Sequence, residues 1–141
     1  MAYDVVFYAS NAIALAGWVL LIALPQTRAA TWVRQTMAPS IAIATLYAGL
    51  VIATFIGGGS DGDFFTLDGV KRLFDDRGVL TAAWIHYLAF DLAIGCWMSR
   101  RARELELAHR WLVPCLGLTL WLGPVGFLLF AVLGRKVRLN A

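Results

Sequence analysis

The chain has 141 residues, of which 60% are hydrophobic and only 15% are charged, and its formal net charge is +3. A soluble domain is usually about 45–50% apolar and about 25% charged, so this composition excludes an ordinary soluble domain and indicates an integral membrane protein. The basic residues lie in short tracts beside apolar segments, as in loops that face lipid headgroups, and we therefore expect membrane lipid and no nucleic acid as partner.

The first predicted helix covers about residues 3–24 and stops at Pro25. No positive n-region precedes it, no small-residue cleavage site follows it, and no Arg- and Ser-rich transit segment is present. We therefore expect a mature or prokaryotic chain, located in a bacterial inner membrane. Asn11 lies inside this helix, and asparagine there commonly joins two helices by a hydrogen bond. We favour that role for Asn11 over a catalytic one.

The second predicted helix covers about residues 38–56, after a linker over 26–37 that carries Arg28 and Arg34. Pro39 suits the first turn of a helix, where no backbone N–H is needed. Among the polar side chains of this second helix, Tyr47 is the one most indicative of a function, because a buried phenol needs a hydrogen-bond partner.

A short amphipathic helix is predicted at about residues 64–76, between the second and third membrane helices. Its apolar residues recur at helical intervals: Leu67, Val70, Leu73 and Phe74. We expect it to lie at the membrane interface or to cap the bundle as a lid. Ser60 and Asp63 have the spacing of a capping box. The calcium-loop pattern fails at Phe65, which has no side-chain oxygen, so we predict no metal.

The third predicted helix, about residues 79–98, carries His86 and Asp91 near its middle. An aspartate at membrane depth costs about 3 kcal/mol on insertion scales and tends to face a bundle interior, a partner or a wet cavity. Since each residue turns the helix by 100°, Tyr87 and Asp91 share a stripe with Trp84, whereas His86 lies about 140° from Asp91. Tyr87 and Asp91 are therefore the better local pair.

The fourth predicted helix covers about residues 111–133 and contains the string Gly123-Pro124-Val125-Gly126. Proline removes the hydrogen bond to the carbonyl four residues back, here that of Leu120, and a carbonyl freed at membrane depth must find a partner. We interpret the string as a kink and close-packing site, or as the wall of a pocket.

These segments predict an all-α fold: one domain over residues 1–141, an integral membrane four-helix bundle with an interfacial helix between its second and third helices. With four crossings, the start of the first predicted helix and the end of the fourth lie on the same side of the membrane. Lys and Arg residues are then tied at six on each side, so the positive-inside rule leaves the orientation open.

Asp91 and His86 are an acid and a base in apolar surroundings, which disfavour the charged form of each. A protonated Asp91 can donate to an ether or epoxide oxygen while a neutral His86 accepts a proton. Alternatively, both hold helices together, and the residues alone favour neither reading. The chain has only two histidines, too few for a membrane di-iron site. They also do not suit a haem with two axial histidines, because His109 lies beyond the end of the helix that carries His86. We therefore predict no cofactor. Cys96 and Cys115 fit small apolar core positions.

Several strings together resemble the abscisic-acid-deficient-four type of small membrane proteins, the neoxanthin-synthase-like proteins of plastids and their bacterial relatives. The strings are Asp68-Gly69-Val70, Trp84-Ile85-His86-Tyr87-Leu88-Ala89-Phe90-Asp91-Leu92, Val113-Pro114-Cys115-Leu116 and Gly123-Pro124-Val125-Gly126. The resemblance covers about residues 3–134. It implies a role in xanthophyll metabolism, in plants the opening of a 5,6-epoxide to an allenic alcohol without net redox change.

With this implied reaction, Asp91 is the candidate general acid, His86 the base that removes the C7 proton, and Tyr87 with Asn11 orients them. Aromatic side chains are the candidate walls of a polyene-sized groove: Tyr47, Phe74, Trp84, Trp97 and Trp121. Three classes stay open: a cofactor-free carotenoid or isoprenoid isomerase, a carotenoid- or lipid-binding accessory protein, and a structural or assembly protein. A polyene approaches the ~30 Å of the hydrocarbon core, so we expect a shared groove in a homodimer.

Overall fold

The computed structural model describes residues 2–56 and 62–139, and these residues form seven helices with no strand. The predicted all-α class is confirmed. The helices, in chain order, are α1 (Ala2–Ile22), α2 (Arg28–Thr36), α3 (Ala38–Ile56), α4 (Leu67–Asp75), α5 (Arg77–Glu104), α6 (His109–Leu122) and α7 (Pro124–Leu139).

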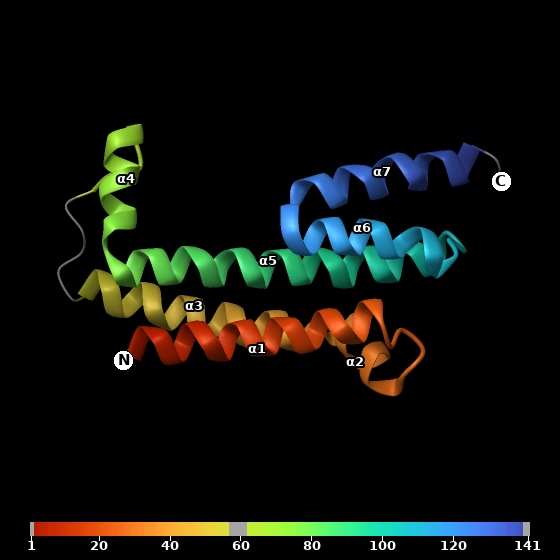
Figure 1. The fold of residues 1–141 in the computed structure, drawn as a ribbon, viewed down its shortest axis with the longest axis horizontal. Helices are drawn as coiled ribbons and strands as arrows, with labels where there is room; N and C mark the ends of the chain where they lie inside the picture. The colour runs from red at the N-terminus through yellow and green to blue at the C-terminus, as the bar shows by residue number, and fades with distance from the viewer. Residues whose placement is uncertain (1, 57–61, 140–141) are drawn as a thin grey trace.

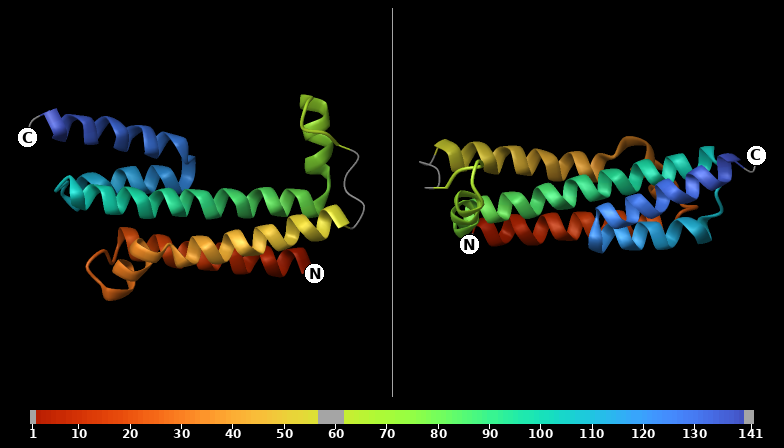
Figure 2. Two further views of the ribbon diagram at one scale, coloured as in Figure 1. Left: turned by 180° about the vertical axis from the view of Figure 1, so that it is seen from behind. Right: turned by 90° about the horizontal axis from the view of Figure 1, so that it is seen from above.

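Helix α5 is the central element, and every other helix is arranged around it (Figure 1). Its 28 residues extend about 42 Å. Helices α1 and α3 lie along one side of it, α6 and α7 cover its C-terminal half on the other, and α4 stands across its N-terminal end (Figures 1 and 2). Asp76 starts α5 by accepting a hydrogen bond from the Val79 N–H at 2.9 Å, which satisfies one of the free donors of the first turn.

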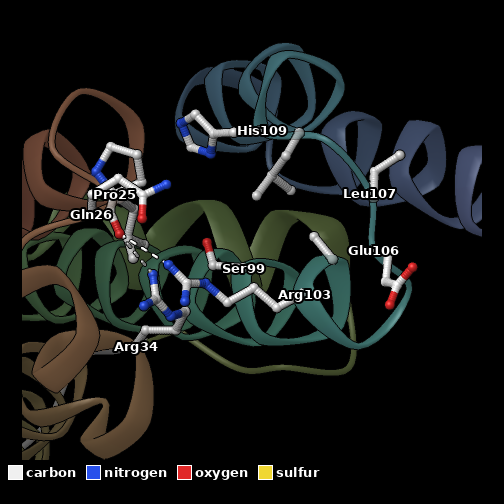
Figure 3. Close-up of a pocket in the computed structure, with 11 residues that line it drawn as sticks. Pro25, Gln26, Arg34, Ser99, Arg103, Glu106, Leu107 and His109 are labelled. Carbon is white, nitrogen blue, oxygen red and sulfur yellow. Dashed lines mark hydrogen bonds between the residues drawn. The ribbon is translucent and has the colours of Figure 1, made fainter.

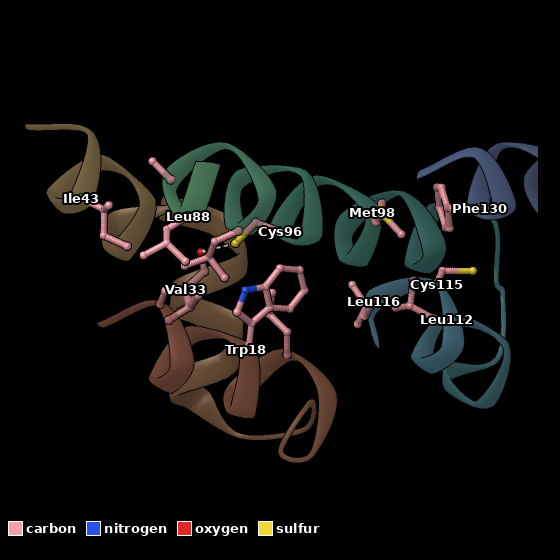
Figure 4. Close-up of a cluster of buried hydrophobic side chains, with 14 of the residues drawn as sticks. Trp18, Val33, Ile43, Leu88, Cys96, Met98, Leu112, Cys115, Leu116 and Phe130 are labelled. Atoms are coloured by element: carbon pink, nitrogen blue, oxygen red, sulfur yellow. Dashed lines mark hydrogen bonds between the residues drawn. The ribbon is translucent and has the colours of Figure 1, made fainter. Parts of the chain in front are cut away.

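The core is built on α5, and two glycines let α1 approach it closely. A Cβ on Gly17 would lie 2.8 Å from Leu92 of α5, and a Cβ on Gly95 of α5 would lie 2.7 Å from Trp18 of α1. Small residues at such contacts are typical of membrane helix pairs. Trp18 belongs to one continuous apolar cluster that continues through Cys96 and Met98 to α6 and α7 (Figure 4).

The predicted linker over residues 26–37 contains a helix, α2, so the prediction of a plain linker was wrong. The Thr27 hydroxyl accepts a hydrogen bond from the Ala30 N–H at 3.1 Å and caps the helix start. Met37 ends α2 in a left-handed conformation at φ 54°, and α2 and α3 are bent by 48° at this break.

Helix α4 confirms the predicted short helix between the second and third apolar segments, with bounds Leu67–Asp75 inside the predicted 64–76. Its cap is Thr66, whose hydroxyl accepts from the Gly69 N–H at 2.9 Å. Asp63 instead holds the turn before it, and Ser60, the other half of the predicted capping box, lies outside the described residues. Helix α4 lies across the axis of α5 (Figure 1), the orientation that an interfacial helix would have.

The predicted fourth helix, residues 111–133, is two antiparallel helices, α6 and α7, which form a hairpin (Figures 1 and 2). The chain turns at Gly123, whose φ of +37° favours glycine. Pro124 begins α7, where its missing N–H is tolerated. A Cβ on Gly126 would lie 2.3 Å from the Thr119 backbone N, so the two helices pack backbone to backbone. The predicted kink is therefore a full reversal.

The apolar part of α7 is too short to cross a membrane by itself. The apolar part of α7, residues 124–134, extends about 16 Å, close to half of the ~30 Å hydrocarbon core. In the described part of the chain, α1 and α5 are long and apolar enough to span a membrane, and α2 with α3 is a third span if the bent pair counts as one. Two or three candidate spans therefore replace the four predicted.

The reversal moves the last basic residues to the opposite end of the bundle. Nine of the twelve Lys and Arg residues now lie at the end formed by α2, the α5–α6 turn and the end of α7, which we call the basic end: Arg28, Arg34, Arg100, Arg101, Arg103, Arg110, Arg135, Lys136 and Arg138. The other three, Lys71, Arg72 and Arg77, lie on α4 and at the start of α5.

Apolar side chains are exposed on the outside of the bundle along its whole length. They include Tyr8, Leu15, Ile41, Ile52, Phe90, Trp121, Leu128 and Val132. Contiguous apolar surface of this extent is rare on a soluble monomer. Together with the candidate spans, it supports the predicted membrane location.

Candidate functional site

Asp91 lies at the middle of α5 and faces the tip of the α6–α7 hairpin. A Cβ on Gly123 would lie 2.9 Å from Asp91 Oδ1, so only glycine allows the tip to come this close. The other carboxyl oxygen, Oδ2, is buried and has no hydrogen-bond partner among the described residues. An unpaired buried polar atom costs free energy and calls for an explanation.

Tyr87 lies one helical turn before Asp91 and connects α5 to the same hairpin tip. Its hydroxyl donates a hydrogen bond to the Leu120 carbonyl at 3.3 Å, and it lies beside the Asp91 carboxyl. Leu120 is the residue whose carbonyl Pro124 leaves free, so the predicted need for a partner is met by Tyr87. The pairing of Tyr87 with Asp91 on one stripe of α5 also agrees with the sequence.

Asn11 and Trp84 continue this polar stripe toward the start of α1. The Trp84 indole N–H donates to Asn11 Oδ1 at 3.3 Å, and the Asn11 amide donates to the Phe7 carbonyl at 2.7 Å. The Trp84 ring lies 5.7 Å from that of Tyr87. Asn11 therefore joins α1 to α5, as expected of an asparagine in a membrane helix. We call Asp91, Tyr87, Gly123 and the Leu120 carbonyl the hairpin-tip site, which Trp84 and Asn11 adjoin.

His86 does not belong to this group of contacts. Its ring is exposed and lies 4.6 Å from the Phe90 ring and 5.4 Å from the Tyr47 ring of α3, centroid to centroid. It makes no hydrogen bond within the described parts of the chain. The predicted acid and base thus point to different neighbours of α5, as their 140° separation around the helix requires.

The predicted aromatic wall is also divided. Tyr47 and Phe74 line one cavity of about 430 Å³ between α3, α4 and α5, which we call the α4 cavity and which Phe64 and Phe65 also line. Trp97 instead packs against Phe127 and Phe130 of α7, with ring centroids 5.8 and 5.7 Å away. Trp121 is 79% exposed at the end of α6. Of the three predicted tryptophans, Trp84 is the one whose ring contacts that of Tyr87 in the hairpin-tip site.

A second polar cluster, which the sequence did not single out, lies at the basic end. Arg34, Arg103, Ser99 and His109 line a cavity of about 360 Å³, which we call the basic pocket (Figure 3). Arg34 was expected to be a linker charge, yet it is only 3% exposed. The capping threonine before α2 is the signal in the sequence that a helix starts here. In the structure, Arg34 lies on the buried face of that helix together with Ala30 and Val33.

In the described part of the chain, no group of three or more His, Cys, Asp or Glu residues could hold a metal ion. Both cysteines are free and buried, which confirms their prediction as core residues. The Cys96 thiol contacts the Val33 carbonyl at 3.6 Å and so packs α5 against α2.

Comparison with known proteins identifies a family. The chain matches the family described as ABA4-like (ABA DEFICIENT 4-like) over residues 5–130, a range that holds both halves of the hairpin-tip site. No curated protein and no solved structure matches it. Because the match covers most of the sequence, the protein belongs to the ABA4-like family.

Proposed function

We propose that this membrane protein is a cofactor-free isomerase of a carotenoid or related isoprenoid, with Asp91 as its proton-transfer group. The observation that carries the proposal is the buried Asp91 Oδ2, which has no hydrogen-bond partner within the described residues. It lies where a chain reversal meets the middle of α5, and intramembrane ionisable groups at broken helices commonly mark substrate sites. Family membership and the apolar helices support the membrane setting.

The proposed step is an epoxide opening that balances without oxidant or reductant. Asp91 in its neutral form gives its proton to the epoxide oxygen, and the carbon–oxygen bond breaks. A proton on the adjacent chain carbon leaves to a base, and the electron pair of that bond forms the new double bond. One proton is added and one removed, so the product alcohol is an isomer of unchanged mass. Tyr87 holds the hairpin tip and orients the carboxyl.

The base has two candidates. His86 was predicted for it from the sequence, and its contacts with Tyr47 and Phe90 lie on the α3 side of α5. The Asp91 carboxylate itself, once it has given its proton, is the other candidate and needs no second residue. His86→Gln separates them, because it abolishes conversion only if His86 is the base.

The test is conversion in a bacterial host that accumulates epoxy- and hydroxy-carotenoids. The host would express the wild type, Asp91→Asn or an empty vector, with protein in the membrane fraction measured by immunoblot. We expect a new pigment of unchanged mass with the wild type, lost with Asp91→Asn at equal protein level. No new pigment with the wild type, or full conversion by Asp91→Asn, contradicts the proposal.

A second candidate function is pigment or lipid binding without catalysis. The α4 cavity favours it, since a space of about 430 Å³ with Tyr47, Phe64, Phe65 and Phe74 at its wall suits an apolar ligand. Pigment that co-purifies unchanged with the wild type and with Asp91→Asn alike, but not with Phe74→Ala, would support this function. The structural or assembly class remains if neither conversion nor binding is found.

The charge distribution also supports an orientation, with the basic end in the cytoplasm of a bacterial inner membrane. Nine basic residues at that end against three at the other is the asymmetry that the positive-inside rule requires. In intact cells, Phe65→Cys should react with a membrane-impermeant maleimide, and Gln35→Cys only after permeabilisation. Both positions are exposed and uncharged. The reverse pattern would overturn the orientation.

A homodimer that shares a ligand groove belongs to the same proposal. The exposed apolar side chains along the bundle provide surface for a second copy as well as for lipid. Light scattering of the protein in detergent should give the mass of two chains. A monomer with undiminished conversion contradicts the homodimer without affecting the role of Asp91.

A further inference from the structure

The basic pocket contains two guanidinium groups that converge on one uncharged oxygen. Arg34 Nη1 and Arg103 Nη2 both donate to the Pro25 carbonyl, at 3.4 and 3.2 Å (Figure 3). Arg34 also donates to the Thr31 hydroxyl at 2.9 Å. A guanidinium has five N–H donors, so these few bonds leave much of the capacity of both groups unused.

No carboxylate within the described residues forms an ion pair with either arginine. Within the described part of the basic end, the ion pair is that of Arg101 with Glu104. Glu106 lines the pocket, but its carboxylate points away from both guanidinium groups (Figure 3). Two like charges held together around a carbonyl repel each other, and a buried charge is normally paired. An anion in the cavity would remove both costs.

A third polar group completes the pocket. Ser99 is 4% exposed, and its hydroxyl has no hydrogen-bond partner in the described part of the chain. It stands between Arg103 and His109 in the view of Figure 3. The His109 ring is held by a hydrogen bond of Nε2 with the Ile22 carbonyl at 2.9 Å. The unpaired, buried Ser99 hydroxyl can therefore donate a hydrogen bond to an anion that binds in the pocket.

The position of the pocket along α5 indicates the chemistry of the ligand. If Asp91 lies at the middle of the membrane, Ser99 lies about 12 Å and Arg103 about 18 Å from it along the helix. Half of the hydrocarbon core is about 15 Å thick, so the pocket lies at the level of lipid headgroups. Leu21, Leu107 and Leu112 form its apolar wall. Forked guanidinium groups match phosphate oxygens in geometry and charge.

We propose that the basic pocket binds the phosphate group of an amphiphile, with Arg34, Arg103 and Ser99 as its ligands. The phosphate sits between the two guanidinium groups, and the apolar remainder of the molecule lies against the leucine wall. Basic pockets between membrane helices at a cytoplasmic face are known to take up anionic lipid headgroups. None of the residues that line the basic pocket belongs to the hairpin-tip site, so this proposal is independent of the isomerase proposal.

The test measures lipid binding by the full chain in a nonionic, phosphate-free detergent, with native mass spectrometry as the readout. The probes are phosphatidylglycerol and phosphatidylcholine. Arg103→Gln is the main variant because Arg103 is exposed enough for the change to leave folding intact. Arg101→Gln is its matched control, since it removes the same charge two residues away but Arg101 is not among the residues that line the pocket. Ser99→Ala keeps all charges.

We expect Arg103→Gln to weaken phosphatidylglycerol binding about tenfold or more, the value of a charge-assisted hydrogen bond, and Arg101→Gln to change it less than twofold. Ser99→Ala should weaken it severalfold. Equal losses with Arg103→Gln and Arg101→Gln, or no loss with either, would overturn the proposal.

Competition by inorganic phosphate distinguishes the source of the ligand. If millimolar phosphate displaces phosphatidylglycerol from the wild type, the pocket recognises the phosphate group itself, including a free one. If it does not, the ligand is a lipid headgroup held together with its acyl chains. Binding of phosphatidylcholine with the same sensitivity to Arg103→Gln would extend the site to any phosphodiester. All three results require the Arg103→Gln effect, so its absence decides against the site.

Discussion

Asp91 and His86 lie five residues apart on α5, yet their surroundings differ in every respect. Asp91 is half-buried against the hairpin tip, where one oxygen is within reach of the Gly123 backbone and the other has no partner in the described chain. His86 is exposed, lies beside the rings of Tyr47 and Phe90, and makes no hydrogen bond within the described residues. The Asp91 carboxyl therefore lies against the backbone of the hairpin tip, whereas the His86 ring lies against aromatic side chains.

This difference bears on the proposed role of Asp91. A side chain kept only to hold helices together is usually well hydrogen-bonded, because an unpaired buried polar atom is costly. Asn11 meets that description, with bonds to Trp84 and Phe7. Asp91 does not meet it, although Gly123 and Pro124 place a chain reversal beside it. The fold therefore tolerates a cost at Asp91 that an apolar residue would avoid.

The largest expected effect comes from Asp91 itself. Asp91→Leu has nearly the shape of the native side chain, so it should raise the thermal stability of the detergent-solubilised protein, while carotenoid conversion falls by about 10²–10⁴-fold, the range for loss of a general acid. Insertion scales make leucine about 3 kcal/mol more favourable than aspartate at this depth. Thermal unfolding and pigment analysis measure the two effects.

His86→Gln is the matched variant for this comparison. If the Asp91 carboxylate takes up the second proton, conversion stays within a few fold of the wild type. A loss as large as that of the Asp91 variant would make His86 the base. Asp91→Leu that unfolds the protein would show instead that Asp91 is a structural contact.

The hairpin tip itself can be broken at Gly123. Gly123→Ala places a Cβ 2.9 Å from Asp91 Oδ1 at φ +37°, and such backbone strain costs about 1–3 kcal/mol. Gly117→Ala in α6 is the control, because nothing lies within 4 Å of its Cβ and alanine favours a helix interior by about 0.5–1 kcal/mol. Thermal unfolding should separate the two variants in opposite directions. Equal stability of both would contradict the observed turn.

A smaller effect is expected at Tyr87. Tyr87→Phe removes the donor to the Leu120 carbonyl, so stability should fall by about 1 kcal/mol and conversion about tenfold through loss of positioning. Tyr8→Phe, at a 71% exposed position of α1, provides the control. Chemical unfolding monitored by tryptophan fluorescence is the measurement. A stability loss of the same size in both variants would mean that the hydrogen bond from Tyr87 to the Leu120 carbonyl does not stabilise the protein.

Much of this arrangement follows from local rules in the sequence. The 100° turn per residue separates His86 from Asp91 and aligns Tyr87 with Asp91, and the missing N–H of Pro124 identifies the Leu120 carbonyl as the one that needs a partner. The reversal at Gly123 does not follow from them, because a proline predicts a break but not its angle. The angle depends on the Gly126 contact with Thr119, which exists only after α7 has folded back. The prediction of one continuous helix over residues 111–133 is also the reason why the Lys and Arg count came out equal on the two sides of the membrane.

The smallest expected effect concerns Asp63, a carboxyl that lines the α4 cavity on the His86 side of the molecule. It accepts hydrogen bonds from the Phe65 and Thr66 backbone N–H groups, at 2.8 and 2.9 Å, and these bonds, that of Phe65 first, lower the pKa of Asp63 below its ordinary value. The unfolded carboxyl titrates near pH ~3.9. The stabilisation is therefore present above pH ~4 and is lost as pH falls through the lower pKa of the folded state. Thermal midpoints at pH 7 and pH 3 should differ less for Asp63→Asn than for the wild type. An identical difference in both proteins would mean that the hydrogen bonds of the Asp63 carboxyl do not stabilise the fold. The contrast with Asp91, whose Oδ2 has no partner among the described residues, would then not extend to stability.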